Sequence, residues 1–132
     1  MLYPCPVTRS ISTFAEAKLT QKRSKFFALV FPADSLDEAQ KHVKVVRAKH
    51  RRARHVCWAC RVPGPTGTII EQMRDDGEVG HPGRVLLELL QRRDLLGGIV
   101  VSRIFGGVKL GTGGVSRAFR DVAQTALDQL PE

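Results

Sequence analysis

The chain has 132 residues, 42% hydrophobic and 26% charged, a composition that fits one globular domain and argues against disorder. No window approaches the roughly 18 apolar residues of a membrane span, and Met1–Pro6 lacks the charged and apolar regions of a secretory signal. Three cysteines are too few for a disulfide scaffold, so we expect a single-domain, cytoplasmic protein. The net charge of +8 favours negatively charged partners.

The first half of the chain predicts two strands and then a helix. The strands are Phe14–Ala17 and Lys25–Phe31, joined by the polar residues between them. Ser35 and Glu38 form a capping box, which opens a helix that runs to about Lys49. One face of this helix is apolar at helical spacing: Leu36, Ala39, Val43 and Val46.

Two further strands and a second helix follow. The strands are His55–Val62 and Thr68–Met73, joined by a turn rich in Pro and Gly. Pro82 fits the first turn of the helix, and Leu95–Gly98 is expected to end it. The apolar stripe of this helix consists of Val85, Leu86, Leu89 and Leu90.

The chain ends with a buried strand, a glycine-rich loop and a third helix. The strand is Ile99–Phe105, the loop is Gly106–Gly114, and the helix begins near Val115. The order β-β-α-β-β-α-β-α predicts an α/β fold of the α+β type. We expect a two-layer sandwich in which a mixed sheet carries all three helices on one face.

The glycine-rich loop is the strongest local signal for a binding site. It opens a helix, where free backbone N–H groups and the helix dipole attract anions. Its glycines allow a close approach to a ligand, so Gly113→Val is expected to damage it. A strand-to-helix corner, a phosphate site and a nucleotide-dependent catalytic loop all fit. The candidate contacts are Gly106, Gly107, Lys109, Gly111, Thr112, Gly113, Gly114 and Arg117.

The excess of positive charge lies in one stretch of the chain. Residues 39–70 contain eight Lys and Arg and no Asp or Glu, whereas the other residues balance. A localised basic surface attracts polyanions through counterion release, although such charges also occur on plain solvated helices. The candidate nucleic-acid contacts in this stretch are Arg47, Arg51, Arg52 and Arg54.

Asp75, Asp76 and Glu78 place three carboxylates directly after a predicted strand. Such a cluster can hold Mg²⁺ or supply an acid–base pair. It can equally form a turn in which the carboxylates cap the next helix or pair with Lys and Arg. We expect no bound metal and no cofactor.

Cys57 and Cys60 form a C-x-x-C pattern inside a predicted strand. Residues three apart on a strand point to opposite faces, so we expect neither a bridge nor a shared metal. Trp58, which lies between them, either stacks on a base or packs under a neighbouring helix.

Three segments together resemble the YigZ/IMPACT family: Val100–Phe119, Ala53–Ala59 and Asp75–Glu78. Lys22–Phe26 is similar to the opening strand of that family, and the resemblance runs from about Val7 to Leu130. It implies a fold like domain IV of elongation factor G and its ribosomal-protein relatives. Residues 1–132 would then be the single N-terminal domain, without the second, C-terminal domain that bacterial members usually carry.

The resemblance also implies a role in translation, because eukaryotic members regulate translation by interfering with activation of a stress kinase. It carries over no catalytic residue. One departure lies in Val79–Arg84, which replaces the family's Pro-Ser-Gly-Thr-Ala-Gly stretch after Glu78. Any pocket that this stretch helps to shape is expected to be altered here.

Three hypotheses about function follow. The first is a non-enzymatic module of translation that binds RNA, ribosomal components or another polyanion. The second is a protein-interaction regulator of a translational stress response. The third is an enzyme of a phosphate ester or nucleotide, with the loop holding phosphate and the carboxylates holding Mg²⁺. RNA binding alone should weaken steeply with salt.

Overall fold

The computed structural model describes residues 8–131, so Cys5 and the segment Met1–Pro6 lie outside the described residues. The elements in chain order are β1 (Arg9–Ser10), β2 (Ala15–Gln21), β3 (Ser24–Phe31), α1 (Leu36–Lys49), β4 (His55–Pro63), the 3₁₀ turn η1 (Pro65–Gly67), β5 (Ile69–Arg74), α2 (Pro82–Arg92), β6 (Leu95–Ile104) and α3 (Gly111–Leu127). Within this part of the chain, every helix is too short or too polar to span a bilayer.

The strands form one sheet in the order β2-β3-β6-β4-β5, with antiparallel pairing throughout that path. The short strand β1 pairs in parallel with the start of β6, so the sheet is mixed. The predicted α+β fold with a mixed sheet is therefore confirmed. Arg103, on the central strand β6, lies opposite Phe26 of β3 and His55 of β4.

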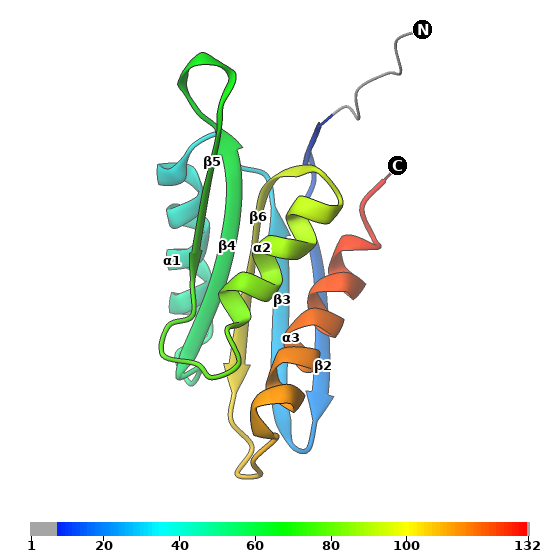
Figure 1. Ribbon diagram of the computed structural model, residues 1–132. Helices are drawn as coiled ribbons and strands as arrows, with labels where there is room; N and C mark the ends of the chain where they lie inside the picture. Colours follow the sequence, from blue (N-terminus) through cyan, green and yellow to red (C-terminus); the bar gives the residue numbers. More distant parts are fainter. Residues whose placement is uncertain (1–7, 132) are drawn as a thin grey trace, which may run out of the picture.

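The prediction that all three helices lie on one face of the sheet is wrong. Figure 1 shows α2 and α3 in front of the sheet and α1 behind it. On β4, Cys57 and Ala59 belong to the core under α2 and α3, whereas Trp58 and Cys60 belong to the core under α1. The molecule has three layers, because the central strands are apolar on both faces and need cover on both.

The core under α2 and α3 is centred on α3. Phe119 is fully buried, and its ring meets that of Phe26 edge-on at a centroid distance of 5.3 Å. The apolar stripe predicted for α2 is buried at Leu86, Leu89 and Leu90. Val85 departs from the prediction, since it is only half-buried.

The core under α1 contains Val43, Val46 and Trp58. Ser35 caps this helix as predicted, because its side chain accepts a hydrogen bond from the Glu38 N–H. Trp58 is 6% exposed and is therefore a core residue, which leaves no ring face for a base. Cys57 and Cys60 are both free thiols on opposite faces, as the strand pattern predicts.

The three largest differences from the expected boundaries concern β2, β6 and α3. Strand β2 continues to Gln21, and the turn is confined to Lys22 and Arg23, which both have positive φ. Leu95–Gly98 forms the start of β6 rather than the end of α2. Gly98 allows the Phe31 ring to pack directly on this strand, because a Cβ at Gly98 would clash with that ring. Helix α3 begins at Gly111, so residues 111–114 form its first turn.

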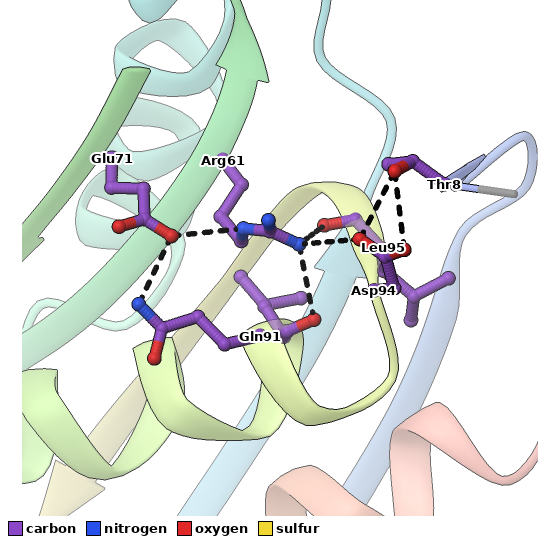
Figure 2. Close-up of polar contacts among 7 residues, drawn as sticks. Thr8, Arg61, Glu71, Gln91, Asp94 and Leu95 are labelled. Carbon is purple, nitrogen blue, oxygen red and sulfur yellow. Dashed lines mark hydrogen bonds and ion pairs between the residues drawn. The ribbon is translucent and has the colours of Figure 1, made fainter. Parts of the chain in front are cut away.

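Arg61, near the end of β4, contacts several elements; the end of β4 lies at the upper end of Figure 1. Its side chain is 10% exposed; Nε donates to Glu71 Oε2 at 3.0 Å, and Nη1 donates to the Leu95 carbonyl at 3.2 Å. Nη1 also reaches Asp94, which accepts a hydrogen bond from Thr8 (Figure 2). Arg61 belongs to the basic stretch of the sequence, yet two carboxylates neutralise its charge here.

The first and last described segments meet at this same end. Arg9–Ser12, Leu130 and Pro131 border one cavity of about 360 Å³. The loop from β6 to α3 lies at the opposite end of the sheet (Figure 1).

Candidate phosphate- and nucleic-acid-binding site

A pocket of about 470 Å³ lies where β6 ends, α3 begins and β4 begins. These ends of the elements lie at the lower end of Figure 1. Three basic side chains line it, and they come from different parts of the chain: Arg54, Arg103 and Lys109. The pocket thus brings the basic segment and the glycine-rich loop together, which sequence alone could not establish.

The N-terminus of α3 forms one wall of this pocket. Gly111 and Thr112, the first two helical residues, line it. No side chain caps this helix end, and its first turn holds no acidic residue. The free N–H groups and the positive end of the helix dipole are therefore available to an anion. The glycine-rich loop proper is shorter than expected and ends at Leu110.

Arg103 forms the buried part of the pocket wall. Its side chain is 8% exposed, and Nη1 donates to both carboxylate oxygens of Glu78 at 3.1 Å. The guanidinium lies 5.7 Å from the Phe26 ring centroid and 5.6 Å from that of Phe105. These contacts hold the group in one orientation, while Nε is buried without a hydrogen-bond partner among the described residues.

Each carboxylate of the acidic cluster has a protein partner. Asp75 Oδ1 accepts from the Gly83 N–H at 2.8 Å and so caps α2. Asp76 Oδ2 accepts from the Val56 N–H at 2.8 Å and from Arg47 at 3.1 Å. Glu78 neutralises Arg103, as described above. The structure therefore places the cluster in a turn with capping and pairing roles, and residues 8–131 contain no acidic, His or Cys grouping suited to a metal.

The predicted arginines occupy four different places. Arg54 lines the pocket, whereas Arg51 and Arg52 border a shallow groove beside Ile104. Arg47 pairs with Asp76 at 3.1 Å and is half exposed. Arg117 is exposed on α3, six residues after its start at Gly111. We call the surface formed by Arg51, Arg52, Arg54, Lys109 and the Lys22–Arg23 turn the basic end; the turn lies at the same end of the sheet (Figure 1).

Within the segment Gly106–Gly114, the glycine whose Cβ would clash with neighbouring atoms is Gly106 rather than Gly113. A Cβ on Gly106 would lie 2.1 Å from the backbone carbon of Arg23, so the loop packs directly on the β2–β3 turn. A Cβ on Gly113 would meet only Arg117 Nη1 at 3.4 Å. The structure gives no backbone reason for Gly113→Val to damage the loop.

Sequence reasoning missed Arg103, His55 and Phe105 as pocket residues. Arg103 carries a visible signal, because a charged residue inside the apolar run of β6 needs a special partner. His55 carries no comparable signal in the sequence, because only the fold brings its ring to the pocket. Its Nδ1 lies 2.8 Å from the Asp76 carbonyl oxygen.

Comparison with known proteins places these residues in a family context. The family model described as the Impact N-terminal domain matches residues 22–127, which include the whole pocket. An IMPACT family member from Haemophilus influenzae is 38% identical over 109 residues, covering 80% of this chain and 52% of that protein. The chain spans about half the length of the curated bacterial relatives it matches.

Solved structures similar to the chain include the following two. A crystal structure of a hypothetical protein matches with a TM-score of 0.84 at 32% identity, covering 91% of this chain and 59% of the other. The two-domain translational regulator Yih1 matches with a TM-score of 0.60 at 25% identity, covering 98% of this chain and 54% of the regulator.

Proposed function

Because the chain belongs to the Impact N-terminal domain family, we propose that it is a non-enzymatic module that regulates translation by binding RNA through its basic end. The similarity to the translational regulator Yih1 supports the translational part of this proposal. The location of the charge supports the RNA part.

One observation carries the proposal. The pocket joins Arg54 to Lys109 and to the uncapped start of α3, and a basic groove with Arg51 and Arg52 lies beside the same strand end. Cations and free N–H groups that share one end of a molecule form a surface for successive phosphates.

The positions of the acidic and thiol groups favour binding over catalysis. Asp75 caps a helix, Asp76 holds β4, and Glu78 is 3% exposed and paired with Arg103. Burial raises the pKa of the Cys57 thiol, and the nearby Glu78 charge raises it further, so this group stays protonated and weakly nucleophilic.

A protein-interaction regulator is the second candidate. Phe14 is 56% exposed and Val45 65% exposed, and both border a groove of about 590 Å³ between α1 and the hairpin of β2 and β3. A partner that docks there should co-purify after RNase treatment, whereas RNA-mediated partners should be lost.

Filter binding of RNA between about 50 and 200 mM salt tests the proposal. The affinity should fall by orders of magnitude across this range if the basic end makes several phosphate contacts. Replacing Arg51, Arg52 and Arg54 by Ala should flatten the salt slope by up to roughly 0.7 per lost contact on a single strand, or 0.9 on a duplex.

The matched control removes three exposed positive charges outside the basic end, at Lys41, Lys44 and Arg92. This variant should keep nearly the whole slope, because counterion release counts local contacts rather than net charge. If the basic-end variant binds RNA with unchanged affinity and slope, the arginines are only a solvated surface and the proposal is wrong.

A further inference from the structure

Two independent features of the pocket point to one oxyanion. The first is the start of α3, a helix of 17 residues whose initial N–H groups have no side-chain cap. The second is Arg103, more than nine-tenths buried, whose Nε has no partner among the described residues. A buried N–H without an acceptor is costly, and the usual remedy is a ligand or an ordered water.

The free edge of Arg103 has the geometry of an oxyanion clamp. Glu78 occupies Nη1 and leaves free the edge formed by Nε and Nη2, where Nε has no hydrogen-bond partner within the described part of the chain. Adjacent N–H groups on one guanidinium edge bind phosphate or carboxylate oxygens in a bidentate fashion. Phe26 and Phe105 flank the group, so this edge is preorganised before any ligand arrives.

The remaining wall of the pocket is apolar, which an isolated phosphate ion would not need. It consists of Val79, Phe105, Leu110 and Val115, and Phe105 is 42% exposed. The pocket volume of about 470 Å³ falls within the range of roughly 300–1,000 Å³ that is typical of small-ligand sites. This space suits one flat organic group attached to the anion, and it excludes a paired and stacked double helix.

The local charge selects an anion. Glu78 neutralises Arg103, which leaves Arg54 and Lys109 as the cations that line the pocket without an acidic partner within residues 8–131. His55 also lines the pocket, and its Nδ1 is engaged by the Asp76 carbonyl. Glu78, the buried carboxylate beside the pocket, is already paired, so the field there is positive.

We infer that this pocket binds a single unpaired nucleotide, with its phosphate at the start of α3 and Arg103 and its base against Phe105 and Leu110. The inference rests on the proposed function for the source of that nucleotide, an RNA strand. A free nucleoside monophosphate presents the same chemistry. The basic end would then bind unpaired RNA in preference to a duplex, because the phosphates of a duplex reach only the rim of the pocket.

The test uses a variant that fills the pocket without changing charge or the core. Thr112 is exposed and lines the pocket, and its side chain makes no hydrogen bond within residues 8–131, so Thr112→Phe fills the pocket space that Arg103 also lines. Thr125→Phe is the matched control, an exposed threonine near the other end of α3. Each protein is titrated with single-stranded oligoadenylate, with a blunt RNA duplex of equal length, and with AMP, adenosine and inorganic phosphate.

We expect single strands to bind at least about tenfold more tightly than the duplex, and Thr112→Phe to remove this preference while Thr125→Phe keeps it. In NMR spectra, AMP should shift the Arg103 Nε–H signal and the Gly111 and Thr112 amide signals more than phosphate or adenosine does. A folded Thr112→Phe protein with unchanged single-strand affinity overturns the inference.

The two proposals fail in different ways. If Thr112→Phe binds RNA normally but the triple basic-end variant does not, the pocket inference is wrong and the proposed function stands. If AMP shifts the Arg103 signal but no RNA binds, the nucleotide pocket stands with a free ligand and the proposed function fails.

Discussion

Arg103 shows how a charged side chain is accommodated within an apolar strand. Its charge is compensated by Glu78 on a loop, and its guanidinium lies over the rings of Phe26 and Phe105. Such a pair adds little net stability over apolar residues of the same size, but removal of one partner leaves a buried charge. The pair therefore makes the loop that carries Glu78 dependent on the strand that carries Arg103.

Glu78→Ala should lower the free energy of unfolding by about 3–5 kcal/mol, since it leaves Arg103 buried without a counter-charge. Arg47→Ala, which breaks the half-exposed pair with Asp76, should cost under about 1 kcal/mol. Urea denaturation of both variants measures the difference. Equal losses would show that the Arg103 pair is solvated like the surface pair.

The thiol of Cys60 gives the fold a pH dependence at high pH. Burial raises the pKa of Cys60 from 9.0 to about 11, so the unfolded chain loses this proton before the folded chain does. The stabilisation is therefore fully present below pH 9 and is lost as the pH rises towards 11. Its slope is at most about 1.4 kcal/mol per pH unit.

Denaturant unfolding of the wild type and Cys60→Ala at pH 8 and 10 checks this effect. The cavity left by alanine lowers the free energy of unfolding equally at both pH values, whereas the stabilisation from the protonated thiol is smaller at pH 10. The difference in free energy of unfolding between wild type and Cys60→Ala should therefore shrink by about 1 kcal/mol at pH 10. An identical gap at both pH values would contradict the burial of this thiol.

At the scale of elements, glycine has opposite effects in the loop before α3 and in the first turn of that helix. Gly106 must remain glycine because its Cα packs against the backbone of Arg23, and its N–H donates to Ser24 Oγ at 3.3 Å. Gly113 lies in the first helical turn, where glycine only weakens the helix.

Gly106→Ala should destabilise the protein by more than about 1 kcal/mol, because loop and turn must separate to admit a Cβ. Gly113→Ala should stabilise it by up to about 1 kcal/mol, since alanine is the better helix former. Thermal unfolding of the two variants gives the signs directly. A stabilised Gly106→Ala protein would mean that the loop does not pack on the turn.

The elements themselves were predictable from sequence, but their layers were not. The amphipathic pattern of α1 identifies its buried face, yet it does not say which side of the sheet that face covers. The relevant signal was the unbroken apolar run of β4, where both Cys57 and Trp58 are buried. A strand buried on both faces requires cover on both. The start of α3 was also misplaced, because four residues that include three glycines resemble a loop.

For the site, sequence identified residues but not their relations. Lys109 and Arg54 were candidates for separate reasons, and only the fold places both in one pocket. For Asp75 and Asp76, the sequence allowed either a metal-binding or a structural role. The structural role depends on hydrogen bonds to Gly83 and Val56, which the spacing of residues in the sequence does not reveal.

At the scale of the whole molecule, the position of a charge matters more than its sum. Arg54 and Arg61 lie in the same basic stretch of sequence, but Arg54 lines the pocket and Arg61 is paired at the opposite end. Steering and counterion release depend on where such charges face solvent.

Arg54→Gln and Arg61→Gln remove the same charge and should separate these effects. Arg54→Gln should flatten the salt slope of RNA binding by roughly 0.7–0.9 with little change in stability. Arg61→Gln should leave that slope unchanged and lower the free energy of unfolding by about 2–3 kcal/mol, because its charged hydrogen bonds are lost. Filter binding and urea denaturation measure the two quantities. A flattened slope in Arg61→Gln would indicate a net-charge effect.

The meeting of Arg9–Ser12 with Leu130 and Pro131 around one cavity has a consequence for chain connectivity. A short glycine-serine linker there would close the described chain into a ring far from the pocket. The exposed turn Pro65–Gly67, which protrudes at the same end in Figure 1, then offers a place to open the ring. A circular permutant made this way would have new ends and a new order of elements, with Arg54, Arg103 and Lys109 still converging on one pocket.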